Sequence, residues 1–389
     1  MRTVVTARRL FRTAEVIEEP FVLIEEDRIV SIGSRVESEL PANARRLDFA
    51  DATLVPSYVD IHIHGCAGHD VMEATPAALS AVGPFLTGHG VGAYFPTTVT
   101  APVPATIQAL QGLGKLLKSP EGFPGARPLG IHLEGPFLSH SKRGVHPPSH
   151  LQRPSIALFK QFWEAAEGQI RIMTVAPELA GATELIRYAT SLGVRCSIGH
   201  SDATADEAQA GIDSGACSAT HTFNAMRRLD HRDPGIAAVV LDDDNLFAEV
   251  ICDGLHVAPS VVRLFLKAKG PRRGILITDG ISATGMPDGK YFLGGFEVDV
   301  ANGVCSHDGV LAGSVLTLDK AVRNLVSFTR AEWQAATRMA STNPAELTGV
   351  DADYGSLDEG RRADITVLSP DGMIVETLLA GQPTQVPAQ

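Results

Sequence analysis

The chain has 389 residues, of which 44% are hydrophobic and 20% are charged, and its formal net charge at pH 7 is -12. This balance excludes a disordered chain, and the acidic charge argues against a nucleic-acid partner, which needs a basic face. No apolar run approaches the roughly 20 residues that cross a bilayer, and the first residues lack the apolar core of a signal peptide. The five cysteines are dispersed without a Cys-x-x-Cys pair, so we expect reduced thiols in a cytoplasmic protein that contacts no membrane.

The two ends of the chain carry similar patterns. Residues 20–33 predict a β-hairpin, and residues 363–380 predict a second one that turns at Pro370-Asp371-Gly372. Neither end has enough strand to be stable alone, so we expect the two ends to pair. The expected product is a small β-sandwich domain built from residues 1–56 and 346–389.

Residues 57–345 alternate apolar strands with helical stretches. The expected strands include 127–133, 170–175, 194–198, 246–252 and 274–278. The expected helices include 204–214, 259–269 and 329–341, and the last opens with Thr329 and Glu332 at the spacing of a capping box. Repeated βα units with continuous apolar strands are typical of a parallel sheet covered on both faces. We therefore expect an α/β fold with a (β/α)₈ TIM-type barrel, in which six strands are clear and the others are inferred; fewer than eight would make an open sheet.

Polar residues follow the expected strands at once. The strand-end residues of this kind are His62 and His64, Glu134, His200, His221, and Asp279. Because all strand carboxyl ends of a barrel open on one face, residues more than 200 positions apart converge there.

The pair His62-x-His64 indicates a metal site. Side chains two residues apart on a strand point to the same side, and two imidazoles at that distance suit one ion. An isolated pair is weak evidence, but here three further strand ends carry Glu134, His200 and His221. Glu134 also has a simpler interpretation as an exposed loop carboxylate, and Asp279 has one as a turn former.

Two further interpretations concern Asp279 and His132. Asp279 at the mouth of a barrel is a candidate base toward metal-activated water. His132 lies two residues before Glu134 and is expected either behind the ligands or in the core.

Six motifs in fixed order resemble the amidohydrolase superfamily and, within it, the N-acetylglucosamine-6-phosphate deacetylase family. They are HxH, HLEGPF, GHSDA, THTFNAM, DGLH and TDG, and the resemblance covers essentially the whole chain. Residues 133–137, 221–226 and 253–256 are specific to that branch, whereas HxH alone indicates only the superfamily. The resemblance implies hydrolysis of N-acetyl-D-glucosamine 6-phosphate to D-glucosamine 6-phosphate and acetate, in amino-sugar catabolism and cell-wall recycling.

The resemblance also implies residue roles. Glu134, His200 and His221 would bind the principal metal, and His62, His64 and Asp279 would complete a second site that Glu134 bridges. Asp279 would shuttle the proton, and His146 would polarise the acetamide carbonyl. The residues expected to bind the substrate are Val145, His146, Asn224, Ala225, Arg232, His256, Leu311, Ala312 and Gly313.

The implied cofactor is one or two divalent ions per subunit, because some family members lack the histidine pair and use one. Zinc is expected first, and iron, manganese or cobalt suit the same donors. The implied partner is a second copy of the chain, since a neighbouring subunit can complete the phosphate site in this family. Arg227 and Arg228 are alternative candidates to Arg232 for binding the phosphate. The simpler interpretation of Arg232 is a surface residue that pairs with Asp233.

Alternatives remain at this stage. Dihydroorotase-like relatives bridge their metals with a carboxylated lysine, and Glu134 in the corresponding motif disfavours them. An N-acetylgalactosamine-6-phosphate deacetylase differs by the orientation of one hydroxyl and stays open, as do other amidohydrolases. A metal-free barrel that serves as a binding scaffold would lose ligands, whereas this chain keeps all six strand-end residues.

Overall fold

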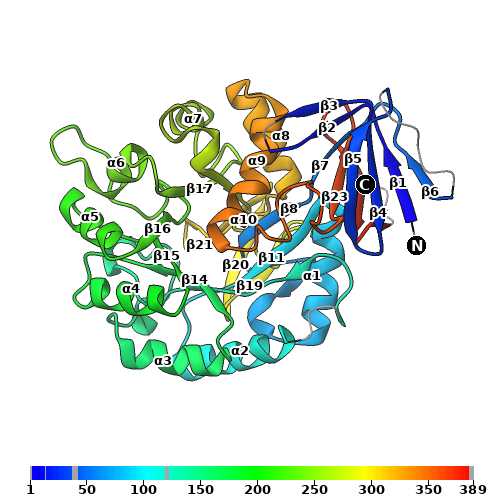
Figure 1. Ribbon diagram of the computed structural model, residues 1–389. Helices are drawn as coiled ribbons and strands as arrows, with labels where there is room; N and C mark the ends of the chain where they lie inside the picture. Colours follow the sequence, from blue (N-terminus) through cyan, green and yellow to red (C-terminus); the bar gives the residue numbers. More distant parts are fainter. Residues whose placement is uncertain (1, 14, 37–42, 119–121, 385–389) are drawn as a thin grey trace.

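The computed structural model describes residues 2–13, 15–36, 43–118 and 122–384. Within these ranges, eight parallel strands form a nearly closed barrel at the centre of the molecule (Figure 1). In hydrogen-bonded order they are β8 (Tyr58–Ile63), β11 (Val91–Thr98), β13 (Ile131–Glu134), β14 (Ile170–Val175), β15 (Arg195–Ile198), β16 (Ala216–Ala219), β17 (Phe247–Ile251) and β18 (Gly274–Ile277). A parallel bridge between Ile63 and Gly280 brings the last strand back to the first. The expected TIM-type barrel is confirmed.

The barrel strands are apolar on both faces because helices cover the outside while side chains fill the inside. All six residues of β8 and all eight of β11 are buried. The covering helices are α1 (Pro76–Gly88), α2 (Val103–Leu116), α3 (Ile156–Ala165), α4 (Ala182–Ser191), α5 (Ala205–Asp213), α6 (Gly235–Asp242), α7 (Pro259–Arg273), α8 (Leu318–Thr329), α9 (Trp333–Ala340) and α10 (Thr342–Thr348). None of the described helices is long and apolar enough to cross a membrane.

The expected helix at 329–341 is wrong at its start. Thr329 is the last residue of α8; its hydroxyl donates to the carbonyl of Leu325 and accepts the N–H of Ala331, which precedes the N-cap residue Glu332, so it does not cap α9. Arg330 follows with a left-handed φ of 61°, which ends α8, and α9 begins only at Trp333. The expected strand 127–133 is also divided, into β12 (Arg127–Pro128) and β13.

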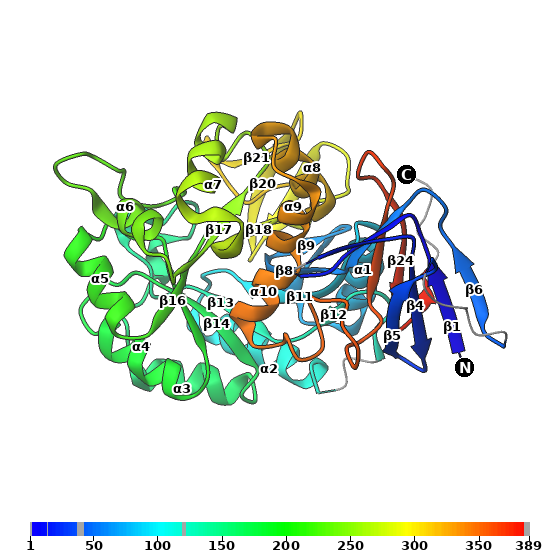
Figure 2. The same cartoon turned by 45° about the horizontal axis from the view of Figure 1, so that its top comes forward.

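Both chain ends form a small domain beside the barrel, and the blue N-terminal and red C-terminal strands lie side by side there in both views (Figures 1 and 2). One sheet has the order β5 (Arg28–Ser34), β4 (Pro20–Glu25), β1 (Arg2–Thr6), β6 (Arg45–Asp48). The other has the order β25 (Gln382–Pro383), β24 (Ile374–Leu379), β23 (Ile365–Leu368), β7 (Thr53–Pro56), β2 (Arg9–Phe11), β3 (Val16–Glu18).

Both expected hairpins are confirmed, as β4–β5 and β23–β24, and an antiparallel bridge between Arg28 and Arg362 connects them at one end. They belong to different sheets, and the C-terminal hairpin pairs with β7. The two sheets share one apolar core, which includes Val22 and Ile24 of β4 and Ile365 and Val367 of β23. The ends are therefore joined by packing as well as by strand pairing.

A four-stranded antiparallel sheet is inserted between β18 and α8. Its strands are β19 (Gly289–Leu293), β20 (Phe296–Ala301), β21 (Val304–His307) and β22 (Val310–Leu311). Leu293, Val298 and Val300 of this sheet pack in one cluster with Val99, which follows β11, and Ile281, which follows β18. The sheet therefore sits against the carboxyl ends of the barrel strands, where the polar residues gather.

Candidate metal centre and active site

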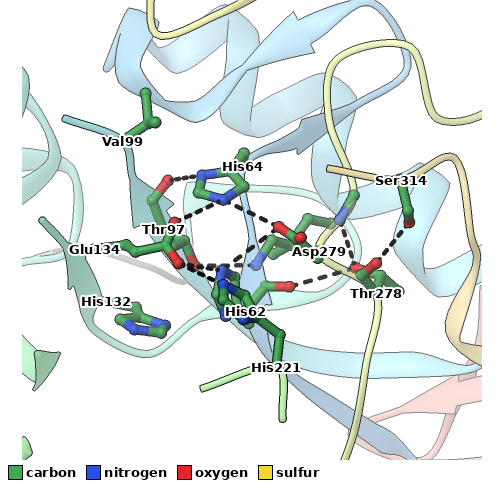
Figure 3. Close-up of polar contacts among 12 residues, drawn as sticks. His62, His64, Thr97, Val99, His132, Glu134, His221, Thr278, Asp279 and Ser314 are labelled. Carbon is green, nitrogen blue, oxygen red and sulfur yellow. Dashed lines mark hydrogen bonds and ion pairs between the residues drawn. The ribbon is translucent and has the colours of Figure 1, made fainter. Parts of the chain in front are cut away.

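Side chains from four other barrel strands converge near Glu134, the last residue of β13. Figure 3 labels His62, His64, His221 and Asp279 around it. His200, His221 and Asp279 are each the second residue after their strand, and His62 and His64 lie at the end of β8. Glu134 Oε1 lies 3.4 Å from His62 Nε2 and 3.2 Å from both His200 Nε2 and His221 Nε2. Glu134 Oε2 lies 3.3 Å from His64 Nε2, and Asp279 Oδ1 lies 3.2 Å from the same nitrogen.

These residues form two buried clusters that can hold metal. One is His62, His64 and Asp279, and the other is Glu134, His200 and His221. His62 Nε2 is buried without a hydrogen-bond partner among the described residues, and His200 Nε2 lies only 3.0 Å from His221 Nε2. Such facing nitrogens beside carboxylates fit a cation between them, and imidazole with carboxylate is a donor set for divalent ions. The site therefore has the donors of a binuclear divalent metal centre.

Hydrogen bonds behind the ligands set the direction of each ring. His64 Nδ1 lies 3.0 Å from the carbonyl of Thr97, and His200 Nδ1 lies 2.9 Å from the carbonyl of Lys142. A carbonyl only accepts, so each Nδ1 carries a proton, and in the neutral ring each Nε2 presents its lone pair to the centre.

Glu249 orients His62 and was missed by the sequence analysis. Its fully buried carboxylate lies 3.1 Å from His62 Nδ1 and accepts the backbone N–H of His221 at 3.1 Å. It contacts one residue of each cluster from behind. The available signal was a single carboxylate inside the expected apolar strand 246–252, because a charge buried there requires partners.

His146 has the opposite tautomer. Its Nδ1 accepts the backbone N–H of Thr100 at 3.3 Å and lies 2.8 Å from the hydroxyl of the same residue. The proton of a neutral His146 ring is therefore on Nε2, which lies 3.4 Å from Glu134 Oε2. His146 thus presents a hydrogen-bond donor to the centre, unlike the neutral forms of His64 and His200.

His132 lies beneath the centre rather than in it. Its Nδ1 donates to the carbonyl of Ile61 at 3.0 Å, and its Nε2 lies 2.8 Å from the hydroxyl of Thr174. Burial lowers its pKa well below the usual value, so the ring is neutral. His132 lies close enough to His62 and Glu249 for the three to form a possible metal-binding group. Both nitrogens of His132 already have hydrogen-bond partners, so we interpret His132 as a residue that supports the metal-binding residues above it.

The charges of the centre are strongly coupled. Burial opposes protonation of His64, but its contacts with Asp279 and Glu134 outweigh that effect and raise its pKa to about 9. Burial likewise opposes ionisation of Asp279, but the hydrogen bond to His64 and the charge of His62 lower its pKa to about 2. Asp279 is therefore an ionised proton acceptor at neutral pH.

Three of the converging residues have left-handed backbone conformations. The φ angles are 47° at His200, 28° at His221 and 50° at Asp279, which cost on the order of 1 kcal/mol or more each in non-glycine residues. Two backbone hydrogen bonds keep Asp279 in this strained conformation. Its N–H donates to the carbonyl of His62 at 2.9 Å, and its carbonyl accepts the N–H of Ser314 at 2.8 Å. These bonds turn the carboxylate toward the barrel axis.

A cavity of about 490 Å³ opens over the centre. Most of the expected substrate residues line it, namely Val145, His146, Asn224, Ala225, His256, Leu311 and Gly313. Ala312 is fully buried in the adjoining apolar cluster and does not line it. Arg232 is exposed outside the cavity, whereas its neighbour Arg228 lines it.

His256 is held at the cavity wall by Asp253. The two side chains lie 2.6 Å apart, from His256 Nδ1 to Asp253 Oδ2. Burial lowers the pKa of His256, but the hydrogen bond and the charge of Asp253 outweigh it, so the net pKa is raised. A ring held in this way presents a positive or strongly polarised edge that suits an anionic ligand.

Known proteins share this arrangement. The Amidohydrolase family model matches residues 53–384. An N-acetylgalactosamine-6-phosphate deacetylase of Escherichia coli O157:H7 is 37% identical over 98% of this chain and 99% of its own length. An N-acetylglucosamine-6-phosphate deacetylase of Vibrio furnissii is 36% identical over 97% of this chain and 93% of its own length.

Among solved structures, a mutant N-acetyl-D-glucosamine-6-phosphate deacetylase of Mycobacterium smegmatis, in complex with N-acetyl-D-glucosamine-6-phosphate, matches with a TM-score of 0.92. It is 34% identical, over 98% of this chain and 99% of that one. The chain therefore belongs to the amidohydrolase family. Within it, the resemblance to the N-acetylglucosamine-6-phosphate deacetylases is confirmed.

Proposed function

We propose that this chain hydrolyses the acetamide of N-acetyl-D-glucosamine 6-phosphate to D-glucosamine 6-phosphate and acetate. The observation that carries the proposal is the convergence of four histidines, Glu134 and Asp279 at the base of one cavity, in a chain whose relatives with that name align along nearly their full length. A stable amide needs an activated nucleophile and a stabilised oxyanion, and the cavity contains residues suited to both tasks.

The donors fit one or two divalent ions, with Glu134, His200 and His221 as the principal set and His62, His64 and Asp279 as the second. Such an ion lowers the pKa of water and polarises a carbonyl. Zinc is the first expectation, and iron, manganese and cobalt suit the same ligands. Metal analysis of the purified protein identifies the ion and its stoichiometry.

Asp279 accepts the proton from the attacking water in this proposal and returns it to the amine nitrogen as the carbon–nitrogen bond breaks. Its ionised state and its contact with His64 support the first role. His146 Nε2–H donates to the carbonyl oxygen as negative charge develops. One such donor is worth about 3–4 kcal/mol of barrier in other enzymes. The atoms balance, since one water yields one carboxylate and one amine.

We propose that the sugar and its phosphate bind at the polar side of the cavity. Asn224, His256 and Arg228 line that side, and Arg228 replaces Arg232 as the first candidate for the phosphate within one subunit. Arg232 contacts the phosphate only if a neighbouring subunit brings the two together, so the expected homodimer stays a prediction. Light scattering on the purified protein tests the oligomeric state.

The galactosamine epimer is the second candidate substrate. The relative from Escherichia coli O157:H7 that carries this name is 37% identical to the chain, and the relative from Vibrio furnissii named N-acetylglucosamine-6-phosphate deacetylase is 36% identical. Acetate release is therefore measured from both 6-phosphates and from unphosphorylated N-acetylglucosamine, on protein of known metal content. Fast release from the glucosamine phosphate alone supports the main proposal. No release from any substrate by metal-loaded protein contradicts it.

A further inference from the structure

The candidate cavity has a buried apolar wall where the end of β11 meets the inserted sheet, in addition to buried Met226 and half-buried Phe223 elsewhere in its lining. Val99 and Leu293 both line the cavity, and each is only 2% exposed. Val145 lines it too and packs against the same apolar cluster. The apolar residues Val310 and Leu311 line it as well, but they are 47% and 39% exposed. Figure 3 shows Val99 near His64, whose Nδ1 is held by the carbonyl of Thr97, two residues before Val99.

This wall is held in place from behind. Leu293 ends β19 and is followed by Gly294, whose φ is +55° and at which an added Cβ would lie 1.9 Å from Val99 Cγ1. The hairpin backbone therefore touches Val99 directly. Gly294 N–H donates to Asp70 Oδ2 at 2.7 Å, and Val99 N–H contacts Met72 Sδ at 3.3 Å. Because Asp70 and Met72 belong to one short segment that holds both Gly294 and Val99, the side chains of Val99 and Leu293 have little room to move away from the cavity.

A groove of about 1000 Å³ lies next to this wall and is lined by Met72, Thr100 and Gly294. Thr100 and Gly294 are chain neighbours of Val99 and Leu293, which line the cavity. Shortening the side chain of Val99 or Leu293 adds depth to the cavity on this side.

Given the proposed function, the residue roles indicate where the acyl chain would lie. The amide carbon would lie beside Glu134 and Asp279, with its oxygen toward His146. Its nitrogen leads to the sugar at the polar side, toward Asn224 and His256. The third substituent is a methyl, which gains most from buried apolar contact.

We propose that Val99 and Leu293, with Val145, form the acyl subsite and restrict the enzyme to short acyl groups. This inference rests on the proposed function and adds the residues that select the acyl chain. Because the wall is fixed by Gly294 and Asp70, an added methylene on the acyl group meets the side chain of Val99 and is not accommodated by movement of the hairpin.

The test uses glucosamine 6-phosphate carrying N-formyl, N-acetyl, N-propionyl or N-butyryl groups, with kcat and KM measured for each. One methylene in an apolar pocket changes kcat/KM by roughly 10-fold or more, so the wild type is expected to favour acetyl over propionyl by that factor. Val99→Ala should raise the propionyl-to-acetyl ratio about 10-fold. Val99→Ile should lower acetyl relative to formyl, and Leu293→Ala should extend tolerance toward butyryl.

Val298→Ala is the matched control. It removes the same two methyl groups from the same apolar cluster, but Val298 does not line the cavity. Its ratios should equal those of the wild type. If Val99→Ala fails to fold, Leu293→Ala and Val99→Ile decide the question.

The acyl subsite is overturned if the variants hydrolyse the four amides with wild-type ratios of kcat/KM, or if Val298→Ala shifts those ratios equally. Failure of the wild type to hydrolyse any of the four amides overturns the proposed function itself.

Discussion

Removing the side chain of Glu249 should weaken metal binding without touching any metal ligand. One oxygen, Oε2, accepts from both His62 Nδ1 and the backbone N–H of His221, while Oε1 is buried without a hydrogen-bond partner among the described residues. Glu249→Ala leaves two buried donors unpaired, each at a cost of about 1–3 kcal/mol. Loss of a residue behind a metal ligand typically lowers metal affinity 10–100-fold, which is about 1.4–2.8 kcal/mol.

The isosteric variant separates hydrogen bonding from charge. In Glu249→Gln the amide oxygen can take the place of Oε2 and keep both bonds, and the new NH₂ replaces the unpaired oxygen. If the bonds orient the ligands, Glu249→Gln should bind metal within a few-fold of wild type, whereas Glu249→Ala should lose 10–100-fold. Competition with a chromophoric chelator measures the affinity, and elemental analysis measures the stoichiometry.

Asn343→Ala is the control for a general loss of stability. Asn343 is fully buried and donates to the carbonyls of Pro271 and Gly274, at the amino end of β18 and away from the metal residues. It should lower the unfolding midpoint and leave metal affinity unchanged. The reasoning is refuted if folded Glu249→Ala binds metal like the wild type. It is also refuted if Glu249→Gln loses as much affinity as Glu249→Ala, since charge alone would then account for the effect.

Three further predictions concern the chemistry, the phosphate and acid stability. Asp279→Asn should lower kcat by about 100–10,000-fold while metal stays bound at Glu134, His200 and His221, and full activity in that variant would remove Asp279 from proton transfer. Arg228→Ala should raise KM for the phosphorylated sugar about 10-fold or more and leave an unphosphorylated amide unaffected; a larger effect from Arg232→Ala in steady-state kinetics would instead point to a phosphate site shared between subunits. Burial alone would raise the pKa of Asp319, but His89 and Arg323 outweigh it and lower that pKa to about 2. A lowered carboxyl pKa gives stability that is complete above about pH 4 and is lost as the pH falls toward 2, worth about 2 kcal/mol here. Urea unfolding between pH 2 and 6 should show this loss in the wild type and a smaller one in Asp319→Asn.

The local sequence pattern predicted the structure correctly where a single strand or a single turn determined it. The hairpins at both chain ends and the central strands from 170–175 to 274–278 appear within a residue or two of their expected positions, because apolar runs and turn residues act over short distances. Patterning failed at 329–341, where Thr329 and Glu332 have capping spacing but Thr329 instead closes the preceding helix. Spacing alone does not show on which side of a residue the helix lies.

The sequence by itself determined the chemistry of this protein: which residues end the barrel strands, and therefore which imidazoles and carboxylates share one face. Only the tertiary structure decided what stands behind and around them. Glu249 supports His62 across 187 residues of chain, and Leu293 comes to the cavity on a hairpin that packs against Val99. Arg228 reaches the cavity while Arg232, four positions along the same loop, does not. Strand-end position follows from local periodicity, but contacts between distant segments depend on how the whole chain packs.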